Sequence, residues 1–314
     1  EQMAFWARAE LERGGGAAPP RPVPPALSAA STLRADEPLA EKTTLRVGGR
    51  ADWWAEAGSE ADLVALLRWA GGAGIGLRVL GAGSNTLVSD LGVRGVVARL
   101  TGPAFGGLRE EQGLVVAGAG APLRRLLDFA EERGWAGLEF LEGIPGSVGG
   151  AARMNAGAWG SAIAERVEWI RYLNADGTAG IVRAAEMAAG YRRCGALEGR
   201  AALEVALRLT RGERAAIRRA RAERAAWRRW MQGLRSAGSV FKNPPGDYAG
   251  RLLEAAGLKG ARIGGARIWE RHANVIVTEP GARASDVRAL LERARAAVRE
   301  RFGVALETEI EVFE

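Results

Sequence analysis

The chain contains a dense run of small residues, Gly143-Ile144-Pro145-Gly146-Ser147-Val148-Gly149-Gly150-Ala151, and Met154-Asn155-Ala156-Gly157-Ala158-Trp159-Gly160 follows it closely. Glycines permit positive φ and let backbone N–H groups approach an anion. One interpretation is a tight loop packed beneath a helix. The other is backbone that lies flat against a large planar or anionic ligand, and this stretch alone leaves both open.

A second glycine-rich stretch, Gly81-Ala82-Gly83-Ser84-Asn85, follows the apolar run Leu77 to Leu80. It matches neither the dinucleotide pattern G-x-G-x-x-G nor a P-loop, because no Lys-Ser/Thr pair follows its second glycine. Ser84 and Asn85 can add hydrogen bonds to a pyrophosphate, although such a stretch is also common as a plain turn. Two such segments in one chain favour a single extended cofactor.

Helical and strand patterns around both stretches predict an α/β organisation from about Thr43 onward. Apolar residues at helical spacing predict a helix over residues 55–71, with Ser59 as its N-cap, and a second helix over residues 122–133. Short apolar runs predict strands at residues 77–80, 93–100, 114–118, 167–174, 181–183 and 201–210.

The composition changes at Arg211, where an Arg-, Ala- and Glu-rich helix is predicted over residues 212–230. The Pro-rich run at residues 17–25 cannot form a regular helix interior, so we expect residues 1–38 to be an N-terminal extension with a short helix at 3–13. Beyond residue 230 the pattern predicts a hairpin-like region at 236–245, helices at 248–256 and 284–302, and strands near 273–277 and at 307–313.

The 314 residues include one cysteine, Cys194, and one histidine, His272. These counts exclude an intramolecular disulfide and Cys- or His-rich metal centres, so we expect no metal. The chain has no run of 18 unbroken apolar residues and no signal-peptide pattern, so we expect no membrane insertion and a cytoplasmic location. The net charge of +7 favours anionic partners.

Three further segments carry polar side chains that suit a site. Residues 236–244 place Ser239, Lys242 and Asn243 within five positions, and a Ser-His-Asp hydrolase is disfavoured because no His or Asp adjoins Ser239. Within Tyr191-Arg192-Arg193-Cys194, Arg192 can form a fork onto a carboxylate. Strand alternation over Leu306-Glu307-Thr308-Glu309-Ile310 would put both glutamates on one face, although a solvated surface is the commoner reading of either of these two segments.

Taken in order, these segments resemble the UDP-N-acetylenolpyruvoylglucosamine reductase family, also called UDP-N-acetylmuramate dehydrogenases. No single motif suffices, but the shared order is specific and covers roughly residues 40–312. The segment from Arg192 to Ser239, which lacks an extra closing loop, is similar to the shorter of the family's two subtypes. The matching motifs are Thr43–Gly49, Gly81–Asn85, Glu142–Gly150, Met154–Ala158, Tyr191-Arg192, Ala237–Pro244, Ala255–Gly260, His272–Asn274 and Leu306–Glu309.

The resemblance implies an α+β fold, with a two-part FAD-binding α/β unit of the VAO/PCMH type plus a C-terminal α/β substrate-binding domain. Residues 39–213 would form the FAD-binding region, completed by the C-terminal strand at 303–314, and residues 214–302 would form the substrate-binding domain. The implied reaction reduces UDP-N-acetylglucosamine enolpyruvate to UDP-N-acetylmuramate for peptidoglycan, with non-covalent FAD and with NADPH as co-substrate. We expect a UDP-sugar partner and favour a monomer.

The resemblance also implies roles for individual residues. Arg192 and Glu309 would hold and polarise the substrate carboxylate, and Ser239 would protonate the carbanionic carbon. Because Glu309 helps only when it is protonated or hydrogen-bonded, we expect its pKa to be raised. The implied binding residues are Tyr191, Lys242 and Asn243 for the UDP-sugar, and Gly81, Ala82, Gly83, Ser84, Asn85, Gly143, Ile144, Pro145, Gly146, Ser147, Gly149, Gly150 and Ala151 for FAD.

Three positions depart from the family pattern. Cys194 stands where a serine is usual, Trp269 replaces a small polar residue, and Glu311 occupies a position where a basic residue is common. We expect Glu311 on the same strand face as Glu309. An extra carboxylate there would raise the pKa of Glu309 further or weaken a flavin contact.

Two rival functions remain. A nucleic-acid or anionic-membrane binding protein would use the arginines and tryptophans of the 212–230 helix on phosphates and bases. The alternative is an amphipathic helix whose Ala215, Ala216, Ile217, Ala220 and Trp227 pack inward, which we favour, so we expect no nucleic-acid partner. The second rival is a flavin-binding relative that reduces another compound, and the presence of Arg192, Ser239 and Glu309 argues against it.

Overall fold

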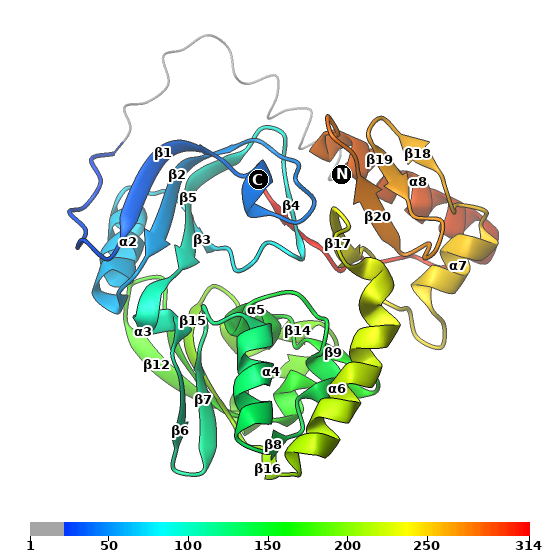
Figure 1. Ribbon diagram of the computed structural model, residues 1–314. Coiled ribbons are helices and arrows are strands. Elements are labelled where there is room, and N and C mark those ends of the chain that lie inside the picture. Colours follow the sequence, from blue (N-terminus) through cyan, green and yellow to red (C-terminus); the bar gives the residue numbers. More distant parts are fainter. Residues whose placement is uncertain (1–21) are drawn as a thin grey trace.

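A four-stranded sheet with the order β1-β2-β5-β3 forms the first body of the computed structural model, which describes residues 22–314 (Figure 1). Strand β1 is antiparallel to β2, whereas β2 and β3 run parallel to β5. Apolar side chains of helix α2 are buried against this sheet. The elements are β1 (Thr32–Pro38), β2 (Arg50–Ala57), α2 (Glu60–Gly72), β3 (Leu77–Val79) and β5 (Val93–Leu100).

Two expectations for this body were wrong. Residues 32–38, which we assigned to the extension, form β1, because they pair along the full length of β2. The helix predicted to begin at Ala55 begins at Glu60, since residues 50–57 are held as a strand between two neighbours. The N-cap is confirmed: the Ser59 hydroxyl accepts a hydrogen bond from the Asp62 N–H. The helix expected at residues 3–13 lies outside the described residues.

The second body is an antiparallel five-stranded sheet with the order β12-β11-β15-β7-β6. Helices α4 and α5 cover one face, and Leu126, Val148 and Ile170 are fully buried between helices and sheet. The predicted strand at 114–118 is confirmed residue for residue. The elements are β6 (Leu108–Glu111), β7 (Leu114–Gly118), α4 (Leu123–Glu132), α5 (Val148–Arg153), β11 (Val167–Leu173), β12 (Ala179–Arg183) and β15 (Ala201–Leu207).

The third body is an antiparallel sheet with the order β17-β20-β19-β18, packed on helices α7 and α8. The predicted helix at 284–302 is confirmed, but the final strand is shorter than predicted. This last strand, β21, pairs in parallel with β4, so the chain end returns to the first body. The elements are β4 (Thr86–Val88), β17 (Ser236–Ser239), α7 (Ala249–Ala255), β18 (Arg262–Ile263), β19 (Ala266–Ile268), β20 (Val275–Thr278), α8 (Ala284–Phe302) and β21 (Glu311–Phe313).

Helix α6 (Arg214–Arg228) runs along the second body toward the third (Figure 1). Ile217 is buried as predicted, but Ala215 and Ala216 are exposed and Trp227 is 70% exposed, so the inward face is narrower than predicted. Its principal anchor is Arg221, which pairs with Asp128, Glu131 and Glu142. Because acidic neighbours already neutralise this guanidinium, Arg221 is a weak candidate for a phosphate contact.

Short elements complete the fold: α3 (Gly102–Gly106), β8 (Trp135–Ala136), β9 (Gly157–Ala158), β10 (Ser161–Ala162), β13 (Ala189–Gly190), β14 (Arg193–Cys194) and β16 (Thr210–Arg211). From residue 22 to the end, no helix is both long and apolar enough to cross a membrane.

Candidate active site

A cleft of about 960 Å³ is lined by residues of all three bodies. A smaller cavity of about 260 Å³ adjoins it and shares Gly81, Ala82, Ser147 and Gly150 with it. The glycine-rich segments predicted to bind a cofactor therefore lie together, although they are far apart in the sequence. All of the candidate cofactor residues line the larger cleft except Gly149, which lines the smaller cavity.

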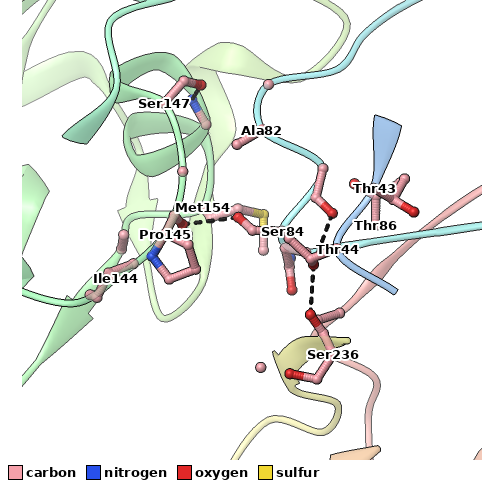
Figure 2. Close-up of a pocket in the computed structure, with 18 of the residues that line it drawn as sticks. Thr43, Thr44, Ala82, Ser84, Thr86, Ile144, Pro145, Ser147, Met154 and Ser236 are labelled. Atoms are coloured by element: carbon pink, nitrogen blue, oxygen red, sulfur yellow. Dashed lines mark hydrogen bonds between the residues drawn. The ribbon is translucent and has the colours of Figure 1, made fainter. Parts of the chain in front are cut away.

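The two glycine-rich segments face each other across a narrow gap (Figure 2). The Ser84 hydroxyl donates to the Pro145 carbonyl at 2.9 Å, and a Cβ on Gly81 would lie 2.6 Å from the Ser147 hydroxyl oxygen. Gly83 has φ +66°, and a Cβ there would lie 2.3 Å from the Lys42 carbonyl oxygen. A side chain larger than hydrogen would collide with protein at Gly81 and Gly83, so bare backbone forms the wall at these two positions.

Arg192 and Glu309 form an ion pair within the cleft, with 2.5 Å between the Arg192 Nε and the Glu309 Oε1. Their side chains are 21% and 13% exposed. Arg192 adopts φ 56°, a left-handed conformation that is uncommon for a residue with a side chain, and its Nη1 also donates to the Gly157 carbonyl. Burial raises the pKa of Glu309, although the charge of Arg192 acts in the opposite direction. The expected rise is thus confirmed.

Asn85 fixes the backbone around Glu309. The Asn85 side-chain amide donates to the Glu309 backbone carbonyl at 3.1 Å, and the Asn85 backbone carbonyl accepts from the Glu311 N–H at 2.9 Å. Asn85 and Ser84 thus each direct a side-chain donor at a protein carbonyl, and the hydrogen bonds that we expected them to give a pyrophosphate would have to compete with these contacts. The segment at 309–311 is positioned by the glycine-rich turn itself.

Ser239 lies beside the Arg192–Glu309 pair. The Glu309 N–H donates to the carbonyl of Val240, the residue after Ser239, at 2.8 Å. Gly238 has φ 72°, and the pairing of β17 with β20 is interrupted between Ser236 and Ser239, which redirects the Ser239 side chain. The Ser239 hydroxyl lines the cleft and makes no hydrogen bond with residues 22–314. It is therefore available to a ligand.

Thr44 connects strand β17 to the glycine-rich turn. Its hydroxyl donates to the Ser236 carbonyl at 2.6 Å, and its N–H donates to the Gly83 carbonyl at 3.0 Å (Figure 2). Sequence reasoning missed this role, although Thr44 belongs to one of the motifs on which the resemblance depends.

The candidate substrate residues Tyr191, Lys242 and Asn243 lie outside the residues that line the cleft. The Tyr191 hydroxyl accepts from the Asn243 N–H at 3.4 Å, and Lys242 pairs with Glu307 at 3.2 Å. Glu307 is 77% exposed whereas Glu309 is 13% exposed, so the prediction that both share one face is wrong. The regular strand begins only at Glu311, and the alternation on which we relied does not apply.

The three departures from the family pattern each have a defined setting. Cys194 is buried, and Trp269 stacks on Trp230 with ring centroids 5.0 Å apart. Glu311 pairs with Arg153, whose Nη2 lies 2.9 Å from the carboxylate, so this carboxylate is already neutralised. The raised pKa of Glu309 comes from burial, and Glu311 is not among its causes. Sequence reasoning missed Arg153 because its partner is distant in the sequence.

Comparison with known proteins gives a consistent result. A family model for the FAD binding domain matches residues 51–182, and one for the UDP-N-acetylenolpyruvoylglucosamine reductase C-terminal domain matches residues 230–313. These matches confirm the expected α+β class, with a FAD-binding unit before a C-terminal domain.

Several relatives carry the same family name. UDP-N-acetylenolpyruvoylglucosamine reductase 2 of Symbiobacterium thermophilum is 44% identical over 90% of this chain and 92% of its own length. The reductase of Anaeromyxobacter sp. (strain K) is 47% identical over 88% of this chain and 84% of its own. The crystal structure of the Thermus caldophilus reductase superposes with a TM-score of 0.78 at 36% identity, covering 90% of this chain and 99% of that one. The chain therefore belongs to the UDP-N-acetylenolpyruvoylglucosamine reductase family.

Proposed function

We propose that this chain reduces UDP-N-acetylglucosamine enolpyruvate to UDP-N-acetylmuramate with NADPH, through bound FAD. The observation that carries this proposal is the Arg192–Glu309 pair, which lies beside Ser239 in a cleft walled by two glycine-rich segments. These groups suit a reaction that adds hydride to an alkene and then a proton to the neighbouring carbon.

The residues present fit FAD. Gly81, Gly83 and Gly146 line the cleft with bare backbone; a Cβ at the first two would collide with the Ser147 hydroxyl and the Lys42 carbonyl, and Gly146 has φ +151°. The larger cleft and the adjoining cavity share residues of both glycine-rich segments and so lie side by side. Bound there, FAD supplies a two-electron hydride relay. Neither glycine-rich segment contains a His or Cys, so we propose non-covalent binding.

Arg192 and Glu309 would bind the substrate carboxylate. Hydride addition at the methylene carbon leaves negative charge on the adjacent carbon and its carboxylate. Arg192 supplies a fixed positive charge there, and such preorganised groups stabilise charge as it develops. Burial raises the pKa of Glu309, which favours the protonated carboxyl that would donate a hydrogen bond to the same carboxylate.

Ser239 would donate the proton that completes the reaction. The Ser239 hydroxyl makes no hydrogen bond with residues 22–314, so it is free to donate its proton to the carbanionic carbon of a substrate in the cleft. The hydroxyl oxygen then regains a proton from water. A serine is a poor acid in water, so the cleft must exclude solvent while the proton moves.

We further propose that residues 39–213 with 303–314 bind FAD, that residues 214–302 bind the UDP-sugar, and that Tyr191, Lys242 and Asn243 contact it. The pairing of β21 with β4 supports the first assignment. We place the enzyme in the cytoplasm as a monomer.

A visible absorption spectrum of the purified protein tests the proposal. We expect a flavin spectrum that bleaches with NADPH and returns under anaerobic conditions when UDP-N-acetylglucosamine enolpyruvate is added. A colourless protein that cannot be reconstituted with FAD would refute it. A flavin that bleaches but is not reoxidised by this substrate would instead favour a relative that reduces another compound.

A further inference from the structure

The glycine-rich turn at residues 81–85 brings backbone donors without an acceptor to the cleft. None of its backbone N–H groups donates a hydrogen bond to residues 22–314, whereas the carbonyls of Gly83 and Asn85 accept from the Thr44 and Glu311 N–H groups. Consecutive free N–H groups in a turn that contains a glycine at positive φ, here Gly83, can form a concave nest for an anion. Backbone donors are otherwise nearly always paired, so this turn suits an anionic ligand.

Arg99, near the end of β5, lies next to this turn. Its Nη2 donates to the Lys42 carbonyl at 3.0 Å, and a Cβ on Gly83 would lie 2.3 Å from the same carbonyl oxygen. The guanidinium carbon also lies 5.0 Å from the ring centroid of Trp54, which is fully buried. These contacts hold the guanidinium beside the bare backbone of the turn.

The guanidinium of Arg99 has no anionic partner in the described part of the chain. Apart from the bond to Lys42, its N–H groups make no hydrogen bond with residues 22–314, and its Nε is buried without a partner. Burial lowers the pKa of Arg99, although the charge of Glu56 acts in the opposite direction. A partly buried cation of this kind is stabilised when a ligand brings an anion to it.

Arg99 also lies where the larger cleft meets the smaller cavity. Among the described residues, the only charged ones that line both are Arg99 and Arg153, and Arg153 already pairs with Glu311. Three other arginines that make no ion pair with residues 22–314 line the larger cleft but not the smaller cavity: Arg46, Arg228 and Arg235. A ligand that occupies both volumes must therefore pass Arg99, and it need not pass these three.

We propose that Arg99 binds the diphosphate of FAD against the free N–H groups of the turn. Arg192, Ser239 and Glu309 line only the larger cleft, so the isoalloxazine ring belongs there. The smaller cavity, which is lined mostly by glycine and apolar residues, is left for the adenosine, and the diphosphate joins these two halves of FAD. A guanidinium forms paired, charge-assisted hydrogen bonds with phosphate oxygens. The inference rests on the proposed binding of FAD in this cleft.

The test is titration of the flavin-free, full-length chain with FAD and, separately, with riboflavin, followed by flavin fluorescence. Riboflavin has the isoalloxazine ring but no phosphate, so its affinity should not depend on Arg99. We expect Arg99→Gln to weaken FAD binding by about tenfold or more and to change riboflavin binding by less than about twofold. Arg99→Lys keeps the charge but not the paired N–H groups, so it should lose less FAD affinity than Arg99→Gln.

Arg235→Gln is the matched control, because it removes a charge without an ion pair that lines only the larger cleft. It should change neither affinity by more than about threefold. Unchanged FAD affinity in Arg99→Gln would overturn the proposal, and so would an equal loss of FAD and riboflavin binding, which would indicate a general disturbance of the fold. An equal loss of FAD affinity in Arg235→Gln would also overturn it, because the charge of the whole cleft would then hold the diphosphate.

These outcomes are separate from the test of the proposed function. If the wild-type flavin is reoxidised by the enolpyruvyl substrate, but FAD affinity does not depend on Arg99, only the role of Arg99 is refuted. A wild-type chain that binds no flavin would refute the proposed function instead.

Discussion

Replacing Ser239 with alanine isolates one step of the proposed reaction. The Ser239 hydroxyl has no hydrogen-bond partner from residue 22 onward, so its removal leaves no buried group unpaired and should change the free energy of unfolding by less than about 1 kcal/mol. A general acid contributes about 10²–10⁴-fold to a proton transfer, which corresponds to about 3–5 kcal/mol of barrier. The expected effect on catalysis is therefore far larger than the effect on stability.

The assay measures the two half-reactions separately, by rapid mixing under anaerobic conditions and flavin absorbance. Ser239→Ala should keep the rate of flavin reduction by NADPH within about twofold to threefold, because no proton donor to substrate carbon is needed there. Reoxidation by the enolpyruvyl substrate should slow by about 10²–10⁴-fold. Ser161→Ala, at a half-buried serine outside the residues that line the cleft, is the matched control and should leave both rates unchanged.

Equal loss of both half-reactions would refute the proton-donor role, because it would indicate a general disturbance of the flavin site. Full reoxidation activity in Ser239→Ala would refute it more directly. In that case the proton would have to come from water or from another group in the cleft.

Three further predictions concern charge and backbone. Burial raises the pKa of Glu309 above its ordinary value of 4.5, so between the two pKa values the folded chain holds a proton that the unfolded chain has lost, and the free energy of unfolding should fall as pH rises through that range. Glu309→Gln should remove this pH dependence in urea unfolding at several pH values, and a free energy of unfolding that depends on pH as before would contradict the assignment. Arg221→Ala should lower the free energy of unfolding in urea by about 2–4 kcal/mol, because three carboxylates lose a partner whose side chain is only 12% exposed. Arg218→Ala removes a side chain that is 63% exposed and has one partner, so it should lower that free energy by less than about 1 kcal/mol, and equal losses would refute the anchoring role of Arg221. Gly83→Ala should lower the FAD-to-protein ratio of the purified enzyme, because the new alanine Cβ would collide with the Lys42 carbonyl. Gly199→Ala is the control, because Gly199 has a similar φ of 68° but no atom near its would-be Cβ, and equal flavin content in both variants would show that the close approach at Gly83 is unimportant.

Much of the fold could be predicted from the sequence where periodicity was strong and local. The strands at 93–100 and 114–118 and the helix at 284–302 were predicted with their observed bounds, because their apolar patterns are long or sharply ended. Strand β1 could not be predicted in the same way. Its residues are mostly polar, and only pairing with β2 holds them as a strand.

In the candidate site, too, local motifs identified the residues but not the long-range contacts that hold them. Motif order brought Arg192, Ser239 and Glu309 to attention, and the structure places all three on one cleft. The contacts that hold them were not predictable, because the Asn85 bond to the Glu309 carbonyl and the Glu311 pair with Arg153 join residues more than 150 positions apart. Local patterns carry no information about such pairs.

The charges of the cleft follow from what each arginine meets in three dimensions. Arg192 and Arg153 each pair with one glutamate, whereas Arg221, which lies outside the cleft, pairs with three acids and is neutralised by protein. Arg228 meets none, although it lies on the same helix as Arg221. Arg46, Arg99 and Arg235 also line the cleft and make no ion pair within residues 22–314, so several positions of the cleft offer a cation that can attract an anionic ligand. The distribution of acidic partners, which no count of arginines reveals, thus decides where a phosphate can bind.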